Sequence, residues 1–483
     1  MKKRFITLFA LLSLFSIISF GCGRDEAEQV TVPDTIVEEA ETVVEETPVA
    51  ENPIMEEPVA EEPVAEKPIE EEEPEIVYPY WWELYDYNAE QEVLAQDGEI
   101  KNLTLQPGNQ PNELYVTWFS RSSSRGKVTF ETDGLFSNIT AKAKTEGSIS
   151  VPGYYRNSAL ITGLESNTTY NYHVSNGNSQ SPTYTYETGD LYATDFTFTI
   201  AGDPEIGLGD PEVLPGQRSI WRVVLNRMRS EIPESSFLLS TGDQIADPAS
   251  SVHYDYFLDN SVLYSTPLVP VVGNHDVGTG FFGDHFSLPN QSALGTSQGR
   301  DGDYWFVKGN VLFMVINTLT VMEKDIHEQF VAEAIAANPD AKWRVIVSHY
   351  SPVTMVERYQ GVREDIKYTF AYMAENFDID LFLSGHDHIY TRGRFLDIDG
   401  DPIMDAEITD EYHNPEHAVY MIFNGATNAL LRTPDAEYPW SAVTVQNGVP
   451  QLSKAHVTEN SFTITTYDAD SWKEVDSFTI YKD

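Results

Sequence analysis

Five apolar segments between residues 195 and 390 each run directly into polar residues, and this recurrence most limits how the chain can fold. The segments read DFTFTIAGD, SFLLSTGD, PLVPVVGNHD, WRVIVSHYSP and DLFLSGHDHIY. Short apolar runs closed by glycine or polar residues are typical of buried strands. Between the first two, QRSIWRVVLNRMRSEI has apolar residues at helical spacing and predicts a β-α-β unit. We therefore expect an α/β domain over residues 194–483.

The residues just past these segments are all of types that bind metal ions. They are Asp203, Asp243, Asn274, His275, Asp276, His349, His386 and His388. Open α/β sheets bind ligands at the carboxyl ends of their strands, where such side chains converge. The mixture of carboxylate, amide and imidazole suits Zn, Fe, Mn or Co better than Ca, which prefers oxygen alone. The pattern predicts one metal site built from five strand ends.

The first residues of the chain predict export. MKKR and the apolar run FITLFALLSLFSIISF lead to Cys22, the only cysteine, so residues 1–22 have the form of a secretory signal. The position of Cys22 resembles the lipidation site of bacterial lipoproteins, although Ser19 stands where leucine is usual. We expect an exported cell-envelope lipoprotein, on the periplasmic or cell-surface side, held to the membrane by a lipid on Cys22. A secretory signal with a passive cysteine is the alternative.

An acidic segment rich in proline and glutamate follows over residues 23–77. Between Arg24 and Glu75 there are 20 acidic and 2 basic residues, so 18 of the 46 net negative charges lie there. Such a composition buries too little apolar surface to fold and predicts a disordered, extended tether. The remainder of the chain is also acidic. We therefore expect no nucleic-acid-binding surface, because phosphate backbones require basic residues.

Residues 98–190 have the pattern of a small antiparallel sandwich. ELYVTWFS, KVTFET, SALITGL and TTYNYHV are short alternating runs separated by glycine, asparagine and serine. LESNTTYNY resembles the tyrosine corner of fibronectin type III domains, with Leu164, Thr168 and Tyr170 at matching spacings. The segment contains no cluster of catalytic residue types, which favours a role as a spacer or packing partner.

The ordered motifs AGDPE, TGDQIAD, GNHD, SHYSP and GHDH resemble those of the calcineurin-like metallophosphoesterases. Over residues 98–483 the chain is similar to the purple acid phosphatase branch, which carries an N-terminal fibronectin type III-like domain. The resemblance implies an α/β fold in which a β-sandwich core flanked by helices follows a small all-β sandwich. It also implies two metal ions, Fe, Zn or Mn, and a small-molecule phosphoester substrate.

The resemblance further assigns roles to the residues at the strand ends. Asp243 would bridge the two ions, Asp203 and His388 would hold the first, and Asn274, His349 and His386 the second. A hydroxide between two such ions can attack phosphorus in line. His275 would donate a proton to the leaving group or stabilise its charge, with Asp276 orienting the imidazole. Phosphomonoesters are the favoured substrates, and phosphodiesters or nucleotides on the same site are the alternative.

Two positions depart from the family pattern. Many metallophosphoesterases have Asp-x-His at the first motif, but here the third residue is Glu205. Purple acid phosphatases have a tyrosine three residues after the bridging aspartate, where this chain has Ala246. Glu205 either completes the first metal site or lies outside it, behind the ligands or facing solvent. These departures keep open a third reading, a degenerate surface binding protein without catalysis.

Two residues shortly after GHDH are candidates for substrate contact. Tyr390 and Arg392 follow this motif closely. The alternative is a strand edge that carries a surface arginine.

Overall fold

The computed structural model describes residues 99–132, 138–207, 214–294, 300–319, 324–357, 359, 364–428, 431–434 and 437–483. All of them belong to one compact unit, Ile76–Asp483. The predicted signal, Cys22 and the predicted tether lie outside the described residues. Within the described residues, no helix is both long enough and apolar enough to cross a bilayer.

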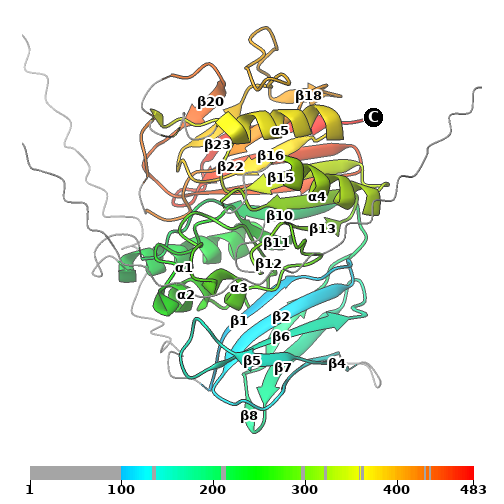
Figure 1. Cartoon of the computed structure of the whole chain (residues 1–483), viewed down its shortest axis with the longest axis vertical. Helices are drawn as coiled ribbons and strands as arrows, with labels where there is room; N and C mark the ends of the chain where they lie inside the picture. The colour runs from blue at the N-terminus through cyan, green and yellow to red at the C-terminus, as the bar shows by residue number, and fades with distance from the viewer. Residues whose placement is uncertain are drawn as a thin grey trace, which may run out of the picture. The chain divides into compact units, whose positions relative to one another are not determined.

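The first part of the described chain is a sandwich of two antiparallel sheets (Figure 1). One sheet has the order β1-β2-β6-β5, and the other has β4-β3-β7-β8 with β9 paired to β7. The strands are β1 (Ile100–Pro107), β2 (Glu113–Ser120), β3 (Gly126–Glu131), β4 (Ile139–Lys142), β5 (Lys144–Gly147), β6 (Tyr155–Thr162), β7 (Thr169–Asn176), β8 (Ser179–Gln180) and β9 (Tyr184–Glu187). In the segment that resembles a tyrosine corner, the Glu165 backbone N–H donates to the buried Tyr170 hydroxyl at 2.9 Å.

The second part contains two seven-stranded sheets and five helices among its described residues. The first sheet comprises, in order, β12 (Leu268–Pro270), β11 (Ser235–Ser240), β10 (Phe196–Ala201), β21 (Gln451–Val457), β22 (Ser461–Asp468), β23 (Glu474–Tyr481) and β18 (Glu411–His413). The second comprises β13 (Tyr304–Lys308), β14 (Val311–Ile316), β15 (Trp343–Ser348), β16 (Leu381–Ser384), β19 (Val419–Ile422), β17 (Tyr390–Gly393) and β20 (Ser441–Val445). The predicted β-α-β unit is confirmed, since β10 and β11 pair in parallel around helix α1 (Leu214–Glu231).

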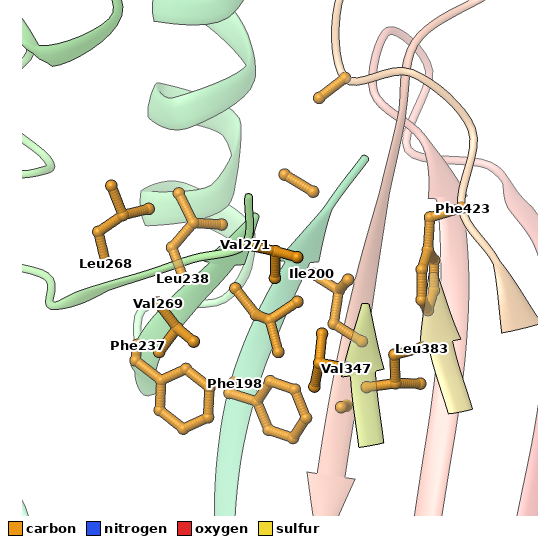
Figure 2. Packing of buried hydrophobic residues seen from close by; sticks show 14 of the residues in the cluster. Phe198, Ile200, Phe237, Leu238, Leu268, Val269, Val271, Val347, Leu383 and Phe423 are labelled. Atoms are coloured by element: carbon orange, nitrogen blue, oxygen red, sulfur yellow. The ribbon is translucent and has the colours of Figure 1, made fainter. Parts of the chain in front are cut away.

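The main hydrophobic core lies between these two sheets (Figure 2). Phe198 of β10 meets Phe313 of β14 edge to face, with ring centroids 5.4 Å apart. Val347 and Leu383, the last apolar residues of β15 and β16, pack into the same cluster. These residues bury large apolar areas, and that burial is the main driving force for stacking the sheets. The stacking brings the strand ends of both sheets to one edge of the core.

Helices cover the outer faces of the sheets (Figure 1). Helices α4 (Lys324–Ala337) and α5 (Glu364–Phe377) pack with β14, β15 and β16 around a second apolar cluster that contains Phe330, Phe370 and Phe382. Helices α1 and α2 (Ser251–Leu258) pack beside β10, β11 and β12. The short helix α3 (Phe281–His285) follows the GNHD loop.

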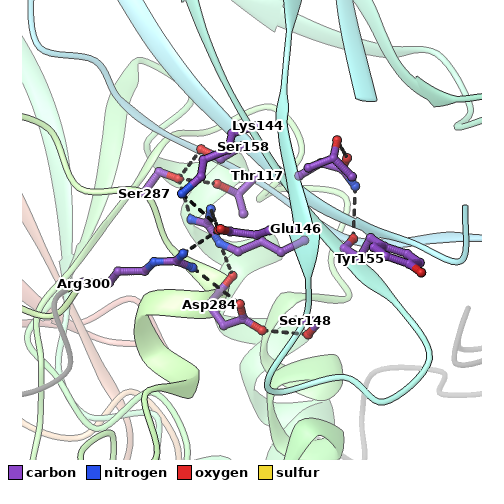
Figure 3. A network of polar contacts seen from close by, with 12 residues as sticks. Thr117, Lys144, Glu146, Ser148, Tyr155, Ser158, Asp284, Ser287 and Arg300 are labelled. Carbon is purple, nitrogen blue, oxygen red and sulfur yellow. Dashed lines mark hydrogen bonds and ion pairs between the residues drawn. The ribbon is translucent and has the colours of Figure 1, made fainter. Parts of the chain in front are cut away.

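Polar contacts join the sandwich to helices α2 and α3. Asp284 accepts hydrogen bonds from the Ser148 hydroxyl at 2.7 Å and from the Ser150 backbone N–H at 3.0 Å (Figure 3). Arg156 Nε donates to the Asp284 carbonyl oxygen at 2.7 Å. Lys101 forms a buried ion pair of 2.8 Å with Asp255 of α2. The sandwich therefore holds the segment that leads away from the GNHD loop.

Candidate active site

The five predicted strand ends converge. Asp203, Asp243 and Asn274 follow β10, β11 and β12 of the first sheet, and His349, His386 and His388 follow β15 and β16 of the second. The parallel strands of each sheet end on the same side. Their loops meet at the edge of the core and place carboxylates and imidazoles from the two sheets within bonding distance of one another.

One cluster of ligand atoms surrounds Nε2 of His349. This atom lies 3.1 Å from Asn274 Oδ1, 3.1 Å from His386 Nδ1 and 3.2 Å from Asp243 Oδ2. Nδ1 of His349 lies 2.9 Å from the Thr241 carbonyl oxygen, which only accepts, so Nδ1 carries the proton. In neutral His349 the Nε2 lone pair then faces oxygen lone pairs. Repulsion among such atoms disappears when a cation lies between them.

A second cluster surrounds Nε2 of His388. Asp203 Oδ2 lies 3.0 Å from this nitrogen and Glu205 Oε1 lies 3.8 Å from it. Glu205 Oε1 also lies 3.4 Å from His275 Nε2. The Glu205 side chain is only 2% exposed, and its Oε2 has no hydrogen-bond partner among the described residues. The solvent-facing alternative for Glu205 is therefore wrong.

The donor sets of both clusters fit metal ions. Ligand atoms of Asp243, His349 and His386 lie within 4.8 Å of one another, and so do those of Glu205, Asp243 and His275. Asp243 belongs to both groups, as expected of a carboxylate between two ions. Clustered carboxylates and imidazoles suit borderline divalent metals. The orphaned Oε2 of Glu205 supplies a further oxygen, so the site accommodates two cations.

The pKa values of the histidines reflect this excess of buried negative charge. Burial lowers the pKa of His349, but Asp243 and Asp203 outweigh it and raise the value to about 9. Burial likewise lowers the pKa of His388, and Asp203 and Glu205 raise it to about 9. Burial raises the pKa of Glu205 to about 6. Without metal ions, protons on the histidines supply the positive charge that the carboxylates require.

The backbone is strained at four of these residues. Glu205, Asp243, His386 and His388 have φ angles of 40°, 45°, 71° and 54°, in the left-handed region that side chains with a Cβ rarely adopt. Each such residue costs about 1–3 kcal/mol, and such strain concentrates at functional sites. The strained backbone at these four residues therefore lowers the stability of the fold and orients their side chains toward the candidate site.

Glycines Gly273 and Gly385 permit close approach at the site. A Cβ on Gly273 would lie 2.1 Å from Asp243 Oδ1, and one on Gly385 would lie 2.2 Å from Asp203 Oδ1. Neither glycine has a positive φ. Both residues are required for space beside a ligand carboxylate.

The structure gives His275 a different hydrogen-bond partner from the expected one. Nδ1 of His275 lies 2.7 Å from the Ala246 carbonyl oxygen, so the expected pairing with Asp276 is not what orients the ring. Asp276 is buried, and its Oδ2 accepts from the Gly273 backbone N–H at 2.9 Å. Burial raises the pKa of Asp276 well above its usual value, with Asp243 acting in the same direction. Asp276 thus supports the loop that carries Asn274 and His275.

Asp387, between the two histidines of GHDH, points away from the ligand clusters. Its Oδ2 accepts from the Thr354 hydroxyl and from the Met355 backbone N–H, each at 2.7 Å. This contact ties the GHDH loop to the loop that follows His349.

The candidates Tyr390 and Arg392 do not reach the site. Both are buried in β17, where the Tyr390 hydroxyl donates to Asp476 and Arg392 forms ion pairs of 2.9 Å with Asp476 and 2.8 Å with Asp410. Sequence reasoning missed two others: Tyr359, whose ring packs on His386, and Arg432, which contacts Tyr359. No periodicity or motif marks them, since their loops approach the site only in the folded chain.

Comparison with known proteins agrees with this geometry. Residues 100–188 match the family described as purple acid phosphatase, N-terminal domain, and residues 188–390 match the calcineurin-like phosphoesterase family. The chain therefore carries a purple acid phosphatase N-terminal domain followed by a calcineurin-like phosphoesterase domain. It is a metal-dependent phosphoester hydrolase.

A solved structure shares the fold at low sequence identity. Purple acid phosphatase PPD1 from yellow lupin (Lupinus luteus) seeds superposes with a TM-score of 0.65 and 14% identity, covering 80% of this chain and 74% of that one. A structure of PhoD has a TM-score of 0.49 and 14% identity, covering 78% of this chain and 92% of that one. None of the curated proteins matches the sequence.

Proposed function

We propose that the protein hydrolyses phosphomonoesters at a dinuclear site and is exported to the cell envelope. The observation that supports this most is the position of Asp243, which shares one group of close ligand atoms with His349 and His386 and another with Glu205 and His275. In this proposal Asp203, Glu205 and His388 hold one ion, and Asn274, His349 and His386 hold the other. Bound Fe, Zn or Mn ions would supply Lewis acidity and lower the pKa of water.

The chain's own residues would place the substrate and move a proton. Hydrolysis forms a bond from water oxygen to phosphorus, breaks the bond from phosphorus to the ester oxygen, and delivers a proton to that oxygen. His275 is the proposed donor, because its side chain is 31% exposed while its Nδ1 is held by Ala246. The proton at Nε2 would then pass to the leaving oxygen. Glu205, 3.4 Å from Nε2, faces the same nitrogen.

The N-terminal residues support the proposed location. The hydrophobic signal and Cys22 motivate a lipid anchor, and the acidic segment over 23–77 would act as a tether between anchor and enzyme. Replacing Cys22 with serine should release the protein from the membrane fraction. Unchanged membrane association and processing of C22S would contradict the lipid anchor.

The catalytic proposal is tested with the purified full-length protein loaded with Fe, Zn or Mn in turn. Metal content is measured together with hydrolysis of para-nitrophenyl phosphate and of its bis-ester. About two ions per chain and faster turnover of the monoester are expected. Faster turnover of the bis-ester would favour the phosphodiesterase alternative. One ion or none, without turnover of either ester, would favour the non-catalytic binding protein.

A further inference from the structure

Arg432 lies close to the GHDH motif, with one aromatic ring between it and His386. Its guanidinium carbon lies 5.3 Å from the centroid of the Tyr359 ring, and its Nη1 donates to the Tyr359 hydroxyl. The Tyr359 ring in turn packs on the His386 imidazole, with centroids 4.6 Å apart. These contacts place Arg432 on the side of the candidate site that His386 forms.

The surroundings of Arg432 do not balance its charge. Among the described residues, no carboxylate lies within ion-pairing distance of its guanidinium, and its half-buried side chain keeps a buried Nε without a hydrogen-bond partner. The carboxylates of Asp203, Glu205 and Asp243 face the ligand clusters, where two divalent ions would more than neutralise them. A half-buried cation beside such a centre is unfavourable unless an anion joins it. A negatively charged ligand at the metal centre would supply a partner for this guanidinium.

A phosphoryl group has the required charge and shape. The planar guanidinium of arginine donates to two phosphate oxygens in a geometry that lysine cannot reproduce. A phosphomonoester carries about −1.5 to −2 charge at neutral pH, because its second pKa is about 6. A diester carries a single negative charge, and its second substituent occupies one of the oxygens. A fixed arginine beside the metal centre hence favours the monoester.

We propose that Arg432, held in place by Tyr359, binds the non-reacting oxygens of the substrate phosphoryl group and thereby selects phosphomonoesters over diesters. This inference rests on the proposed phosphomonoesterase activity. Arg432 would touch the substrate, whereas Tyr359 is a positioning residue that acts through the arginine. The aromatic ring and hydroxyl of Tyr359 hold the guanidinium near His386.

The test compares full-length, metal-loaded wild-type protein with R432Q, R432K and Y359F. Arg227→Gln is the matched control, since Arg227 pairs with Glu231 on helix α1 and contributes nothing to the ligand clusters. We measure metal content, kcat/KM for para-nitrophenyl phosphate and its bis-ester, and binding of inorganic phosphate by calorimetry. R432Q should keep its metal ions and lose about 10- to 100-fold in monoester kcat/KM, with phosphate binding weakened by at least about 10-fold.

The remaining variants separate charge from shape. In R432Q, kcat/KM for the bis-ester should fall less than kcat/KM for the monoester. The ratio of the two kcat/KM values, which measures the preference for the monoester, should therefore decrease. R432K should recover only part of the loss, because it restores charge but not the planar donor pair. Y359F should weaken phosphate binding less than R432Q does.

Specific outcomes would overturn the inference. Wild-type phosphate affinity in R432Q, or an equal loss on both esters accompanied by loss of metal, would show that Arg432 does not bind the phosphoryl group. Wild-type protein that hydrolyses neither ester would instead refute the proposed function. In that case, phosphate binding by wild type and R432Q still decides whether Arg432 is an anion site.

Discussion

Nδ1 of His275 lies 2.7 Å from the carbonyl oxygen of Ala246. Purple acid phosphatases resemble this chain but carry a tyrosine at the position of Ala246. Here the backbone of that residue orients the proposed proton donor, while its methyl side chain offers no ligand. Position 246 thus supports the imidazole and leaves the first metal to carboxylate and imidazole ligands.

The first prediction concerns colour. Without a phenolate at position 246, the iron-loaded protein should show no visible tyrosinate charge-transfer band. Ala246→Tyr should introduce such a band, because it restores the phenolate ligand type that purple acid phosphatases carry at this position. Visible absorption spectra of both proteins, loaded with ferric iron, check this. A strong band in the wild-type protein would show that another tyrosine coordinates the metal.

The second prediction concerns the bridging carboxylate. Asp243→Asn keeps the size of the side chain but removes the negative charge between the group of His349 and His386 and the group of Glu205 and His275. Metal content should fall by at least one ion per chain, and kcat/KM should fall by at least about 100-fold. Asp195→Asn is the control, because Asp195 is exposed and pairs with His456 at the surface. Full activity of D243N with two bound ions would refute the dinuclear arrangement.

The third prediction concerns Glu205, which is buried either as a ligand of the first ion or behind the ligands of that ion. If Glu205 binds the first ion, Glu205→Gln should lower the affinity of the protein for that ion by about 10- to 100-fold. Competition with a chelator measures this affinity. The second ion, held by Asn274, His349 and His386, should keep its affinity. Unchanged affinity for both ions in E205Q would mean that Glu205 lies behind the ligands.

The strand ends could be predicted because each is local in the sequence. An apolar run closed by Gly-Asp or Gly-His is visible without knowledge of the partner strand, and parallel strands necessarily bring such ends together. The β-α-β unit and the tyrosine corner at Tyr170 were recognisable for the same reason. The burial of Arg392 in strand β17 was not, because a buried arginine becomes acceptable only once Asp476, 84 residues along the chain, pairs with it.

The rest of the site depends on contacts that have no local signature. The sequence places His275 beside Asp276, yet the Ala246 carbonyl takes the hydrogen bond that Asp276 was expected to accept. Arg432 comes from a loop without periodicity or motif, and its importance follows only from its contact with Tyr359. Such side-chain partners are set by tertiary packing, which single-sequence patterns do not encode.

The fourth prediction concerns the ion pair between the sandwich and helix α2. Lys101 and Asp255 are each 7% exposed and 2.8 Å apart, and burial raises the pKa of Asp255 even though Lys101 opposes it. Lys101→Met leaves a buried carboxylate without its cation and should lower the free energy of unfolding by about 3–5 kcal/mol near neutral pH. Urea unfolding of the metal-free protein measures this.

The control for this prediction is the surface pair of Lys367 with Asp401, whose carboxylate is 71% exposed. Asp401→Ala should change the free energy of unfolding by less than about 1 kcal/mol. The effect of K101M should shrink at acid pH, where Asp255 takes up a proton. Equal effects of K101M and D401A would mean that the buried pair does not stabilise the packing of the sandwich.

The last prediction concerns pH and the metal-free protein. The pKa values of His349 and His388 are raised from 6.5 to about 9 in the folded chain, because nearby carboxylates outweigh the effect of burial. At pH values between 6.5 and about 9, the folded state therefore binds more protons than the unfolded state. The resulting stabilisation is complete below about pH 6.5 and is lost as the pH rises through about 9.

For the metal-free protein in the presence of a chelator, the free energy of unfolding should thus fall by at least about 1 kcal/mol from about pH 6 to about pH 9.5. Glu205 acts in the same direction at lower pH, since its pKa is raised to about 6. Bound metal ions replace these protons, so the metal-loaded protein should lose less stability over the same range. Urea unfolding at several pH values, with and without metal, measures both curves. A metal-free protein whose stability stays constant or rises with pH would mean that His349 and His388 do not hold protons among the site carboxylates.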